Sequence, residues 1–254
     1  MIYNIFNGGS GRIDPICHVI GSESPDVAVL FDATHHEKAM TIARNLNMAV
    51  FPAQSLRHPD CAIALLSKWE IIEAANLAAV EPFDKQAILQ ATICGPDCLV
   101  MIGAVQSVAE GGFKVPTALA EAAAGNATQA ATRPAVSILL LGGRPTTAPT
   151  QDMLPQEKAR GTAIAPAVPP SWVARAGAET VARLEASGWM DAQTAGGNTA
   201  APIPNYPTNQ PAYRNDYIFI KNRSDLRIKN FRVVQNPLAR FASDHFPICA
   251  DIVL

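Results

Sequence analysis

Two short stretches near the C-terminal end decide how this chain is interpreted. Residues 214–220 read Arg-Asn-Asp-Tyr-Ile-Phe-Ile, and residues 243–247 read Ser-Asp-His-Phe-Pro. Each places charged side chains directly before an apolar run that predicts a β-strand. A hydrolytic site needs one carboxylate for a metal, a second to orient a histidine, and the histidine to act on a phosphoryl oxygen. Asp-His pairs also occur in plain surface turns, so the residues alone leave both interpretations open.

The rest of the chain alternates apolar runs, helical spacing and Gly/Pro punctuation. Because strands outnumber helices and several follow one another through short turns, we expect packed, largely antiparallel sheets with helices outside. Strands are predicted at residues 2–6, 27–31, 62–66, 88–93, 99–102, 136–141, 217–220 and 248–253, and helices at residues 12–20, 38–46, 116–124 and 172–187.

Composition excludes several classes of protein. With 254 residues, 48% hydrophobic and 17% charged, the chain is globular and large enough to fold without disulfides. The net charge of −2 argues against a surface that attracts polyanions as a whole. Five cysteines without a disulfide spacing predict a reducing compartment, hence a cytoplasmic protein, and Cys94 and Cys98 are expected to flank a turn. No secretory signal or membrane span is recognised.

Two proline-rich stretches, residues 142–170 and 196–211, are expected to be loops. Loops of this length inside a domain are typically functional lids or mobile. The same strand and helix signals continue on both sides of them, which indicates a single domain spanning residues 1–254.

The order of the blocks resembles the endonuclease/exonuclease/phosphatase superfamily of metal-dependent phosphoesterases. That resemblance spans essentially residues 1–254 and implies an α/β fold: a four-layer α/β sandwich, two packed mixed β-sheets with helices on the outside, and a site at one edge. The blocks that carry it are Tyr3-Asn4-Ile5 with Gly8-Gly9, residues 11–20, 25–32, 63–69 and 182–191, Asp216-Tyr217, and Ser243-Asp244-His245-Phe246-Pro247.

The resemblance also implies roles for individual residues. His245 matches the catalytic histidine and Asp216 the carboxylate that orients it. Asn4 and Asp244 match metal-site positions, with Mg²⁺ or Mn²⁺ as the implied cofactor. Asp32 stands where the family has its metal-binding glutamate, one methylene shorter.

Other positions depart from the family pattern. Phe31 replaces a glutamine, and the family's Asn-x-His falls on Gly103-Ala104-Val105. The catalytic loop Gly-Asp-x-Asn falls on Gly142-Gly143-Arg144-Pro145, which leaves Arg144 as the group that would bind a phosphate. A positioned acid or base contributes about 10²–10⁴-fold to a rate, so losing several members of one site should leave little turnover.

Two hypotheses follow. We favour a degenerate member with lost or strongly reduced phosphoesterase activity, which binds a phosphorylated ligand, a nucleic acid or a protein through the remnant cleft and has no membrane partner. The alternative is an active divalent-metal-dependent phosphodiester or phosphomonoester hydrolase with a rewired site, in which Asp152 or Glu110 returns a carboxylate. The sequence carries no signal that sets the oligomeric state.

Two further groups of residues have competing interpretations. His35-His36 is expected to be an exposed pair at a helix start, the alternative being an imidazole near the metal position. A basic run either steers a phosphate-bearing ligand or keeps a strand edge solvated. It comprises Lys221, Arg223, Arg227, Lys229 and Arg232.

Overall fold

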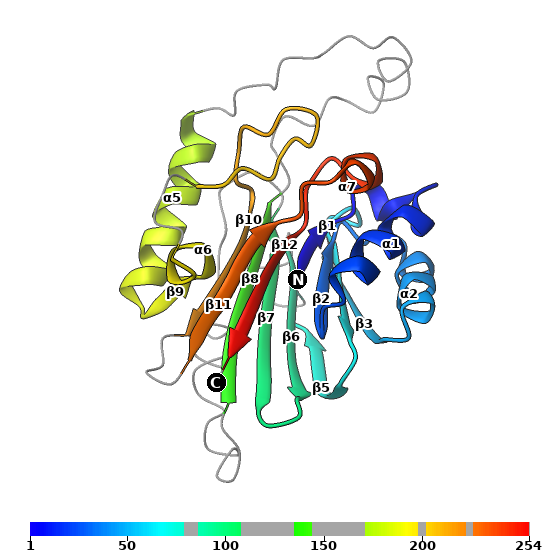
Figure 1. Ribbon diagram of the computed structural model, residues 1–254, viewed down its shortest axis with the longest axis horizontal. Helices are drawn as coiled ribbons and strands as arrows, with labels where there is room; N and C mark the ends of the chain where they lie inside the picture. The colour runs from blue at the N-terminus through cyan, green and yellow to red at the C-terminus, as the bar shows by residue number, and fades with distance from the viewer. Residues whose placement is uncertain (79–85, 108–134, 144–170, 198–201, 222–225, 254) are drawn as a thin grey trace.

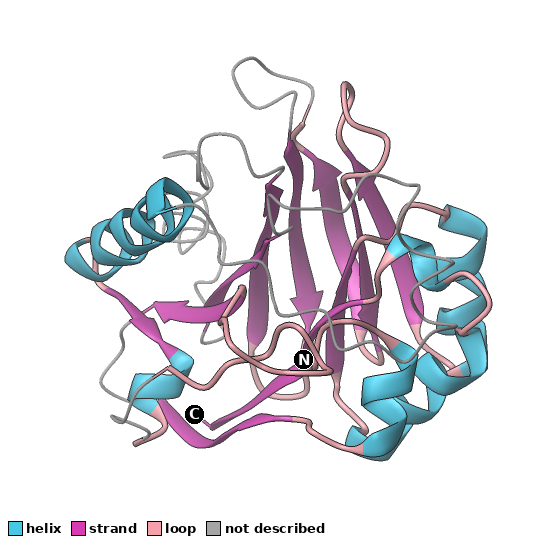
Figure 2. Ribbon diagram, turned by 90° about the horizontal axis from the view of Figure 1, so that it is seen from above, coloured by secondary structure: helices cyan, strands magenta, loops and turns pink. Residues whose placement is uncertain are grey.

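The computed structural model describes residues 1–78, 86–107, 135–143, 171–197, 202–221 and 226–253. Within these ranges, two six-stranded mixed sheets pack face to face, and helices flank their outer faces. Figures 1 and 2 show the strands in the middle of the molecule with helices on either side. The predicted four-layer α/β sandwich is therefore confirmed.

The first sheet carries both ends of the described chain. Its β1 and β2 run parallel, whereas its other described pairs are antiparallel. The strand order is β11 (Arg227–Val233), β12 (Ile248–Val253), β1 (Ile2–Asn4), β2 (Val27–Phe31), β4 (Ala62–Ser67) and β3 (Ala49–Gln54).

The second sheet contains the strand that begins with Asp216. Its β7 and β8 run parallel, and its other described pairs are antiparallel. The strand order is β5 (Glu70–Asn76), β6 (Gln86–Cys94), β7 (Leu99–Ser107), β8 (Ala135–Gly143), β10 (Asp216–Lys221) and β9 (Trp189–Asp191).

Alternation along β4 shows how the layers form. All six of its residues are buried. Ile63 and Leu65 point into the core between the sheets, whereas Ala64 and Leu66 belong to the cluster beneath the helices. Successive side chains of a strand face opposite ways, so a continuous apolar run is what a strand covered on both faces requires.

The helices cover the outer faces through apolar stripes. Ile16, Val19 and Ile20 of α1 (Ile13–Glu23) pack on the first sheet, together with residues of α2 (His36–Asn45) and α7 (Pro237–Ala242). On the second sheet, Leu184 of α5 (Ser171–Ala186) packs with Phe219. Short helical turns complete the described elements: η1 (Asn7–Gly9) and α6 (Ala192–Ala195). No helix of the described ranges combines the length and apolar character needed to cross a bilayer.

Every strand predicted from the sequence is present, and Gly95–Asp97 lies in the turn joining β6 to β7, as expected between Cys94 and Cys98. The helices predicted at 12–20, 38–46 and 172–187 correspond to α1, α2 and α5. The helix predicted at residues 116–124 lies outside the described residues. Gly142 and Gly143 belong to β8 rather than to a loop. The sequence missed β3, β5, β9 and β11 and the helix α7.

Candidate functional site

Asp216 and His245 form a buried, hydrogen-bonded dyad. Nδ1 of His245 lies 2.8 Å from Oδ2 of Asp216, and each residue is 1% exposed. Asp216 begins β10, and His245 lies in the turn between α7 and β12. Because Asp216 engages Nδ1, Nε2 is the nitrogen left for chemistry.

Several carboxylates act on His245. Burial by itself lowers the pKa of the imidazole, but Asp216, Asp244 and Asp32 outweigh that effect, so the pKa of His245 lies above its ordinary value. The positive form of the ring is therefore favoured by the three aspartates around it. Asp32 and Asp244 therefore lie close enough to the dyad to act on His245 electrostatically.

The segment of residues 202–215 covers the dyad. The side-chain amide of Asn205 donates to Oδ2 of Asp216 at 2.5 Å and to the carbonyl of Phe246 at 3.2 Å. Its oxygen accepts from the backbone N–H of Asn215 at 3.0 Å. The Tyr206 ring lies 4.6 Å from the His245 ring, centre to centre. The sequence predicted a loop here but identified neither residue.

Thr208 ties the covering segment to the turn that holds His245. Its backbone N–H donates to the carbonyl of Asp244, and its hydroxyl donates to the carbonyl of Ser243, both at 2.9 Å. Since Thr208 and Ser243 are both buried, these bonds fix the segment against the turn. The covering segment, held to the turn by these hydrogen bonds, thus encloses the dyad.

Asn4, at the end of β1, lies beside the same turn. Its Oδ1 accepts from the backbone N–H of Phe6 at 3.0 Å, and its carbonyl accepts from the Ser243 hydroxyl at 2.7 Å. The Arg12 guanidinium donates to the carbonyls of Phe6 at 2.5 Å and Ala242 at 2.8 Å. Burial lowers the pKa of Arg12, and the nearby Asp244 carboxylate opposes that shift. Arg12 therefore places a fixed cation near Asp244.

Asp32 is bound by a residue that the sequence analysis did not single out. The amide nitrogen of Gln106 donates to Oδ1 of Asp32. The amide oxygen of Gln106 accepts from the backbone N–H groups of Asp32 and Ala62, each at 3.1 Å. The polar side chain that β7 contributes here is therefore Gln106, one residue after Val105.

At the position paired with Asp216, the neighbouring strand β8 has a glycine and so offers no side chain. Gly142 of β8 pairs directly with Asp216. A Cβ atom at Gly142 would lie 2.5–2.7 Å from ring carbons of Phe31, so the Phe31 ring occupies that space. Gly143 ends β8. The substrate-binding residue predicted at Arg144, together with Pro145, Asp152 and Glu110, lies outside the described residues.

The donors around the dyad do not fit a divalent cation. Mg²⁺ and Mn²⁺ favour several oxygen ligands, usually including carboxylates. Among the predicted metal residues, Asp32 is bonded to Gln106, Asn4 Oδ1 accepts from Phe6, and Asp244 Oδ1 accepts from the Ser243 hydroxyl at 3.4 Å. Asp216 Oδ2 is bonded to His245 and Asn205. Of the side-chain oxygens of these residues, all of which the structure describes, only Oδ1 of Asp216 is buried without a hydrogen-bond partner. Across the described ranges, no group of three or more His, Cys, Asp or Glu side chains is arranged to hold a metal ion.

The two histidines and the basic run occupy other places. The pair lies at the start of α2 as predicted, but only His35 is exposed, because His36 is half-buried with its Nε2 buried. Lys221 donates to the carbonyl of Ser187 at 2.7 Å. Arg232 pairs with Glu23 at 2.8 Å and with Asp251 at 3.1 Å. Arg227, Lys229 and Arg232 lie on β11, an edge strand among the described ones, which favours the solvated-edge interpretation for them. Lys221 lies on β10, and Arg223 is outside the described residues.

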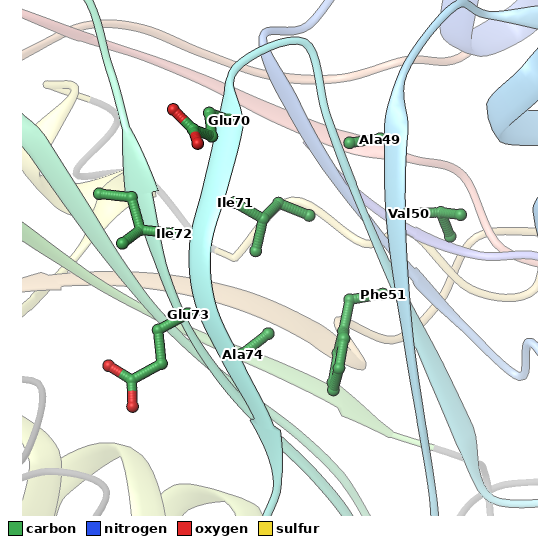
Figure 3. Close-up of a pocket in the computed structure, with 8 residues that line it drawn as sticks. All are labelled: Ala49, Val50, Phe51, Glu70, Ile71, Ile72, Glu73 and Ala74. Atoms are coloured by element: carbon green, nitrogen blue, oxygen red, sulfur yellow. The ribbon is translucent and has the colours of Figure 1, made fainter.

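A shallow groove of about 440 Å³ lies between the sheet edges β3 and β5. Phe51 and Ile71 line it, with Glu70 and Glu73 on β5 (Figure 3). None of the predicted site residues lines this groove.

No family model and no curated protein matches the chain. Solved structures do. An endonuclease/exonuclease/phosphatase family protein from Bacteroides thetaiotaomicron matches with a TM-score of 0.66 and 12% identity, over 99% of this chain and 92% of its own. The D. rerio TDP2 structure with a single-strand DNA product matches with a TM-score of 0.59 and 12% identity, over 100% and 97%. A B. thetaiotaomicron mannosyl-6-phosphatase matches with 0.60 and 13%, over 100% and 98%. Over its whole length, the chain has the fold of the endonuclease/exonuclease/phosphatase proteins.

Proposed function

We propose that this chain is a single-domain, degenerate member of the endonuclease/exonuclease/phosphatase superfamily. In this proposal it has lost phosphoesterase turnover, or retains it only weakly, and binds a phosphate ester through the remnant cleft. The observation that carries the proposal is the enclosed Asp216–His245 pair with Gly142 and Phe31 beside it.

The contacts of the dyad support a structural role. Asn205 and Tyr206 cover Asp216 and His245, and both dyad residues are 1% exposed. A catalytic histidine has to come within hydrogen-bond distance of its substrate. With Gly142 as the neighbour of Asp216, the adjacent strand supplies no acid, base or amide there. The pair therefore serves to join β10 to the turn before β12.

The choice of a phosphate ester rests on the structural neighbours and on one residue. The neighbours include a protein bound to a single-strand DNA product and a mannosyl-6-phosphatase, so the fold accommodates phosphodiesters and phosphomonoesters in those proteins. In this chain Arg144 is the cation that would contact the phosphate, because a guanidinium matches phosphate geometry with paired donors.

An active hydrolase is the second candidate, favoured by the same 2.8 Å pair. A histidine whose pKa is raised by neighbouring carboxylates can donate a proton to a leaving group. This candidate requires Mg²⁺ or Mn²⁺ and a carboxylate supplied by Asp152 or Glu110.

A binding measurement tests the proposal. The purified chain is titrated with a 5′-phosphorylated single-stranded oligonucleotide and with mannose 6-phosphate, and binding is followed by anisotropy and calorimetry. We expect one of the two to bind, Arg144→Ala to weaken that binding by about tenfold or more, and the exposed Arg227→Ala to change it by less than about twofold.

Loss of binding in Arg227→Ala but not in Arg144→Ala would move the phosphate contact to the basic run and contradict the proposal. So would the absence of binding for both probes. Hydrolysis of either probe during the titration supports the second candidate instead.

A further inference from the structure

We propose that the amide of Gln106 takes the place of a divalent cation as the partner of Asp32, so that this part of the site is held together without metal. The inference rests on the proposed function and deepens it. It explains why Asp32, at the position that the resemblance assigns to a metal ligand, stays an acid although the surrounding residues do not fit a divalent cation. It concerns one buried network that joins the two sheets.

Gln106 is a fully buried polar residue, and its side-chain amide bonds to two neighbouring residues, Asp32 and Ala62. It is 0% exposed and lies on β7 of the second sheet. Its amide group contacts Asp32, which directly follows β2, and Ala62, which begins β4 in the first sheet. The side chain therefore bridges the sheets, and a buried amide keeps such a position only when its groups are paired.

The orientation of the amide follows from its neighbours. Two backbone N–H groups, those of Asp32 and Ala62, point at one atom of the amide, each at 3.1 Å. That atom must be the oxygen, since the NH₂ group has no acceptor. The NH₂ group is consequently the one that faces the Asp32 carboxylate, and it presents a positive dipole end to it.

The backbone of Asp32 is held as firmly as its side chain. Its φ is 55°, a left-handed conformation that costs free energy for a residue other than glycine. The Gln106 oxygen binds its N–H, and the N–H of Gly8 donates to its carbonyl at 2.7 Å. Such a conformation persists when its surroundings determine it. Rotating the carboxylate away from Gln106 would break the contact between Oδ1 and the amide nitrogen.

The Gln106 NH₂ group occupies one of the two carboxylate oxygens of Asp32, Oδ1. Metal ions bind acceptor atoms, and the donor face of an amide repels them. A cation at Oδ1 of Asp32 would require Gln106 to withdraw, which leaves the N–H groups of Asp32 and Ala62 buried without this acceptor. The amide is therefore the resident partner of that oxygen.

The test compares metal binding and thermal stability in four proteins, the unmodified chain and three single variants of it. Mn²⁺ binding is measured by the paramagnetic resonance of the free ion for the unmodified chain and for Asp32→Asn, which keeps an oxygen for Gln106 and removes the charge. We expect the two titration curves to coincide. The unfolding midpoint of the unmodified chain should be the same in EDTA as in about 10 mM Mg²⁺.

Gln106→Leu supplies the second readout. Losing the amide should lower the unfolding midpoint by about 5 °C or more, equally with and without Mg²⁺, because buried donors lose their acceptor. Gln210→Leu, at an exposed position, is the matched control and should leave the midpoint within about 2 °C.

One-to-one Mn²⁺ binding that Asp32→Asn weakens by about tenfold or more would overturn the inference. So would a Gln106→Leu variant as stable as Gln210→Leu. These results are separable from the proposed function. Metal-dependent turnover with coincident Mn²⁺ curves contradicts the function alone, whereas metal binding through Asp32 without turnover contradicts the inference alone.

Discussion

Among single residues, Asn205 carries the contacts that join the covering segment to the dyad. It is 0% exposed and bonds through its side chain to Asp216, to the carbonyl of Phe246 and to the N–H of Asn215. If the amide is removed, the N–H of Asn215 and the carbonyl of Phe246 lose this partner, whereas Oδ2 of Asp216 keeps its bond to His245. A buried group without its partner costs about 1–3 kcal/mol.

We therefore expect Asn205→Ala to lower the free energy of unfolding by about 2–4 kcal/mol, measured by urea denaturation. Asn230→Ala, at an exposed position on β11, serves as the control and should stay within about 0.5 kcal/mol of the unmodified chain. Equal stability of the two variants would show that the segment is not anchored through Asn205.

The residues that the sequence predicted and those it missed differ in one physical respect. Asp216 and His245 lie next to apolar strands in a recognisable order, so their pairing was predicted. Gln106 binds Asp32, 74 positions away in the chain, and Asn205 binds Phe246, 41 positions away. The sequence near Gln106 or Asn205 does not predict such a partner, because each contact forms only when distant parts of the chain pack together.

At the scale of elements, the close approach of β8 and β2 decides what the edge of the site contains. A side chain at Gly142 would meet the ring of Phe31 at 2.5–2.7 Å. The glycine and the aromatic ring are thus complementary, and a larger residue at 142 would force one of the sheets to shift.

Gly142→Ala should accordingly destabilise the chain by about 1–3 kcal/mol in urea denaturation. Adding Phe31→Leu should recover part of that loss relative to Phe31→Leu alone, because the smaller side chain frees the space. Gly21→Ala is the matched control. In α1 its Cβ meets nothing closer than 3.7 Å, and we expect a gain of about 0.5–1 kcal/mol. Strictly additive effects of Gly142→Ala and Phe31→Leu would contradict the packing described.

Burial explains which elements could be predicted. Strand β4 is buried on both faces and reads as a continuous apolar run, so it was predicted. Strands β3 and β5 lie at the described edges of the sheets and mix apolar with polar or proline residues, as Pro52 and Glu73 illustrate. Their strand conformation comes from pairing with β4 and β6 rather than from an internal pattern.

Across the whole molecule, fold and site have separate requirements. Apolar clusters between and outside the sheets hold the sandwich together. The chain as a whole matches solved structures of this fold at 12–14% identity. Such a core tolerates many apolar combinations. A catalytic site tolerates few, because each acid, base or ligand acts on a defined atom. A chain can therefore keep this fold while the residues of a site change.

The central claim, that the Asp216–His245 pair is retained for structure while turnover is lost, is tested most directly by one rate ratio. The initial rate of bis-p-nitrophenyl phosphate hydrolysis with Mn²⁺ is measured for the unmodified chain and for His245→Ala, with Asp244→Ala as a second variant and circular dichroism to verify folding. We predict rates that agree within about twofold in all three proteins. A rate that falls by about 10²-fold or more in both variants would contradict the account and identify an active phosphoesterase.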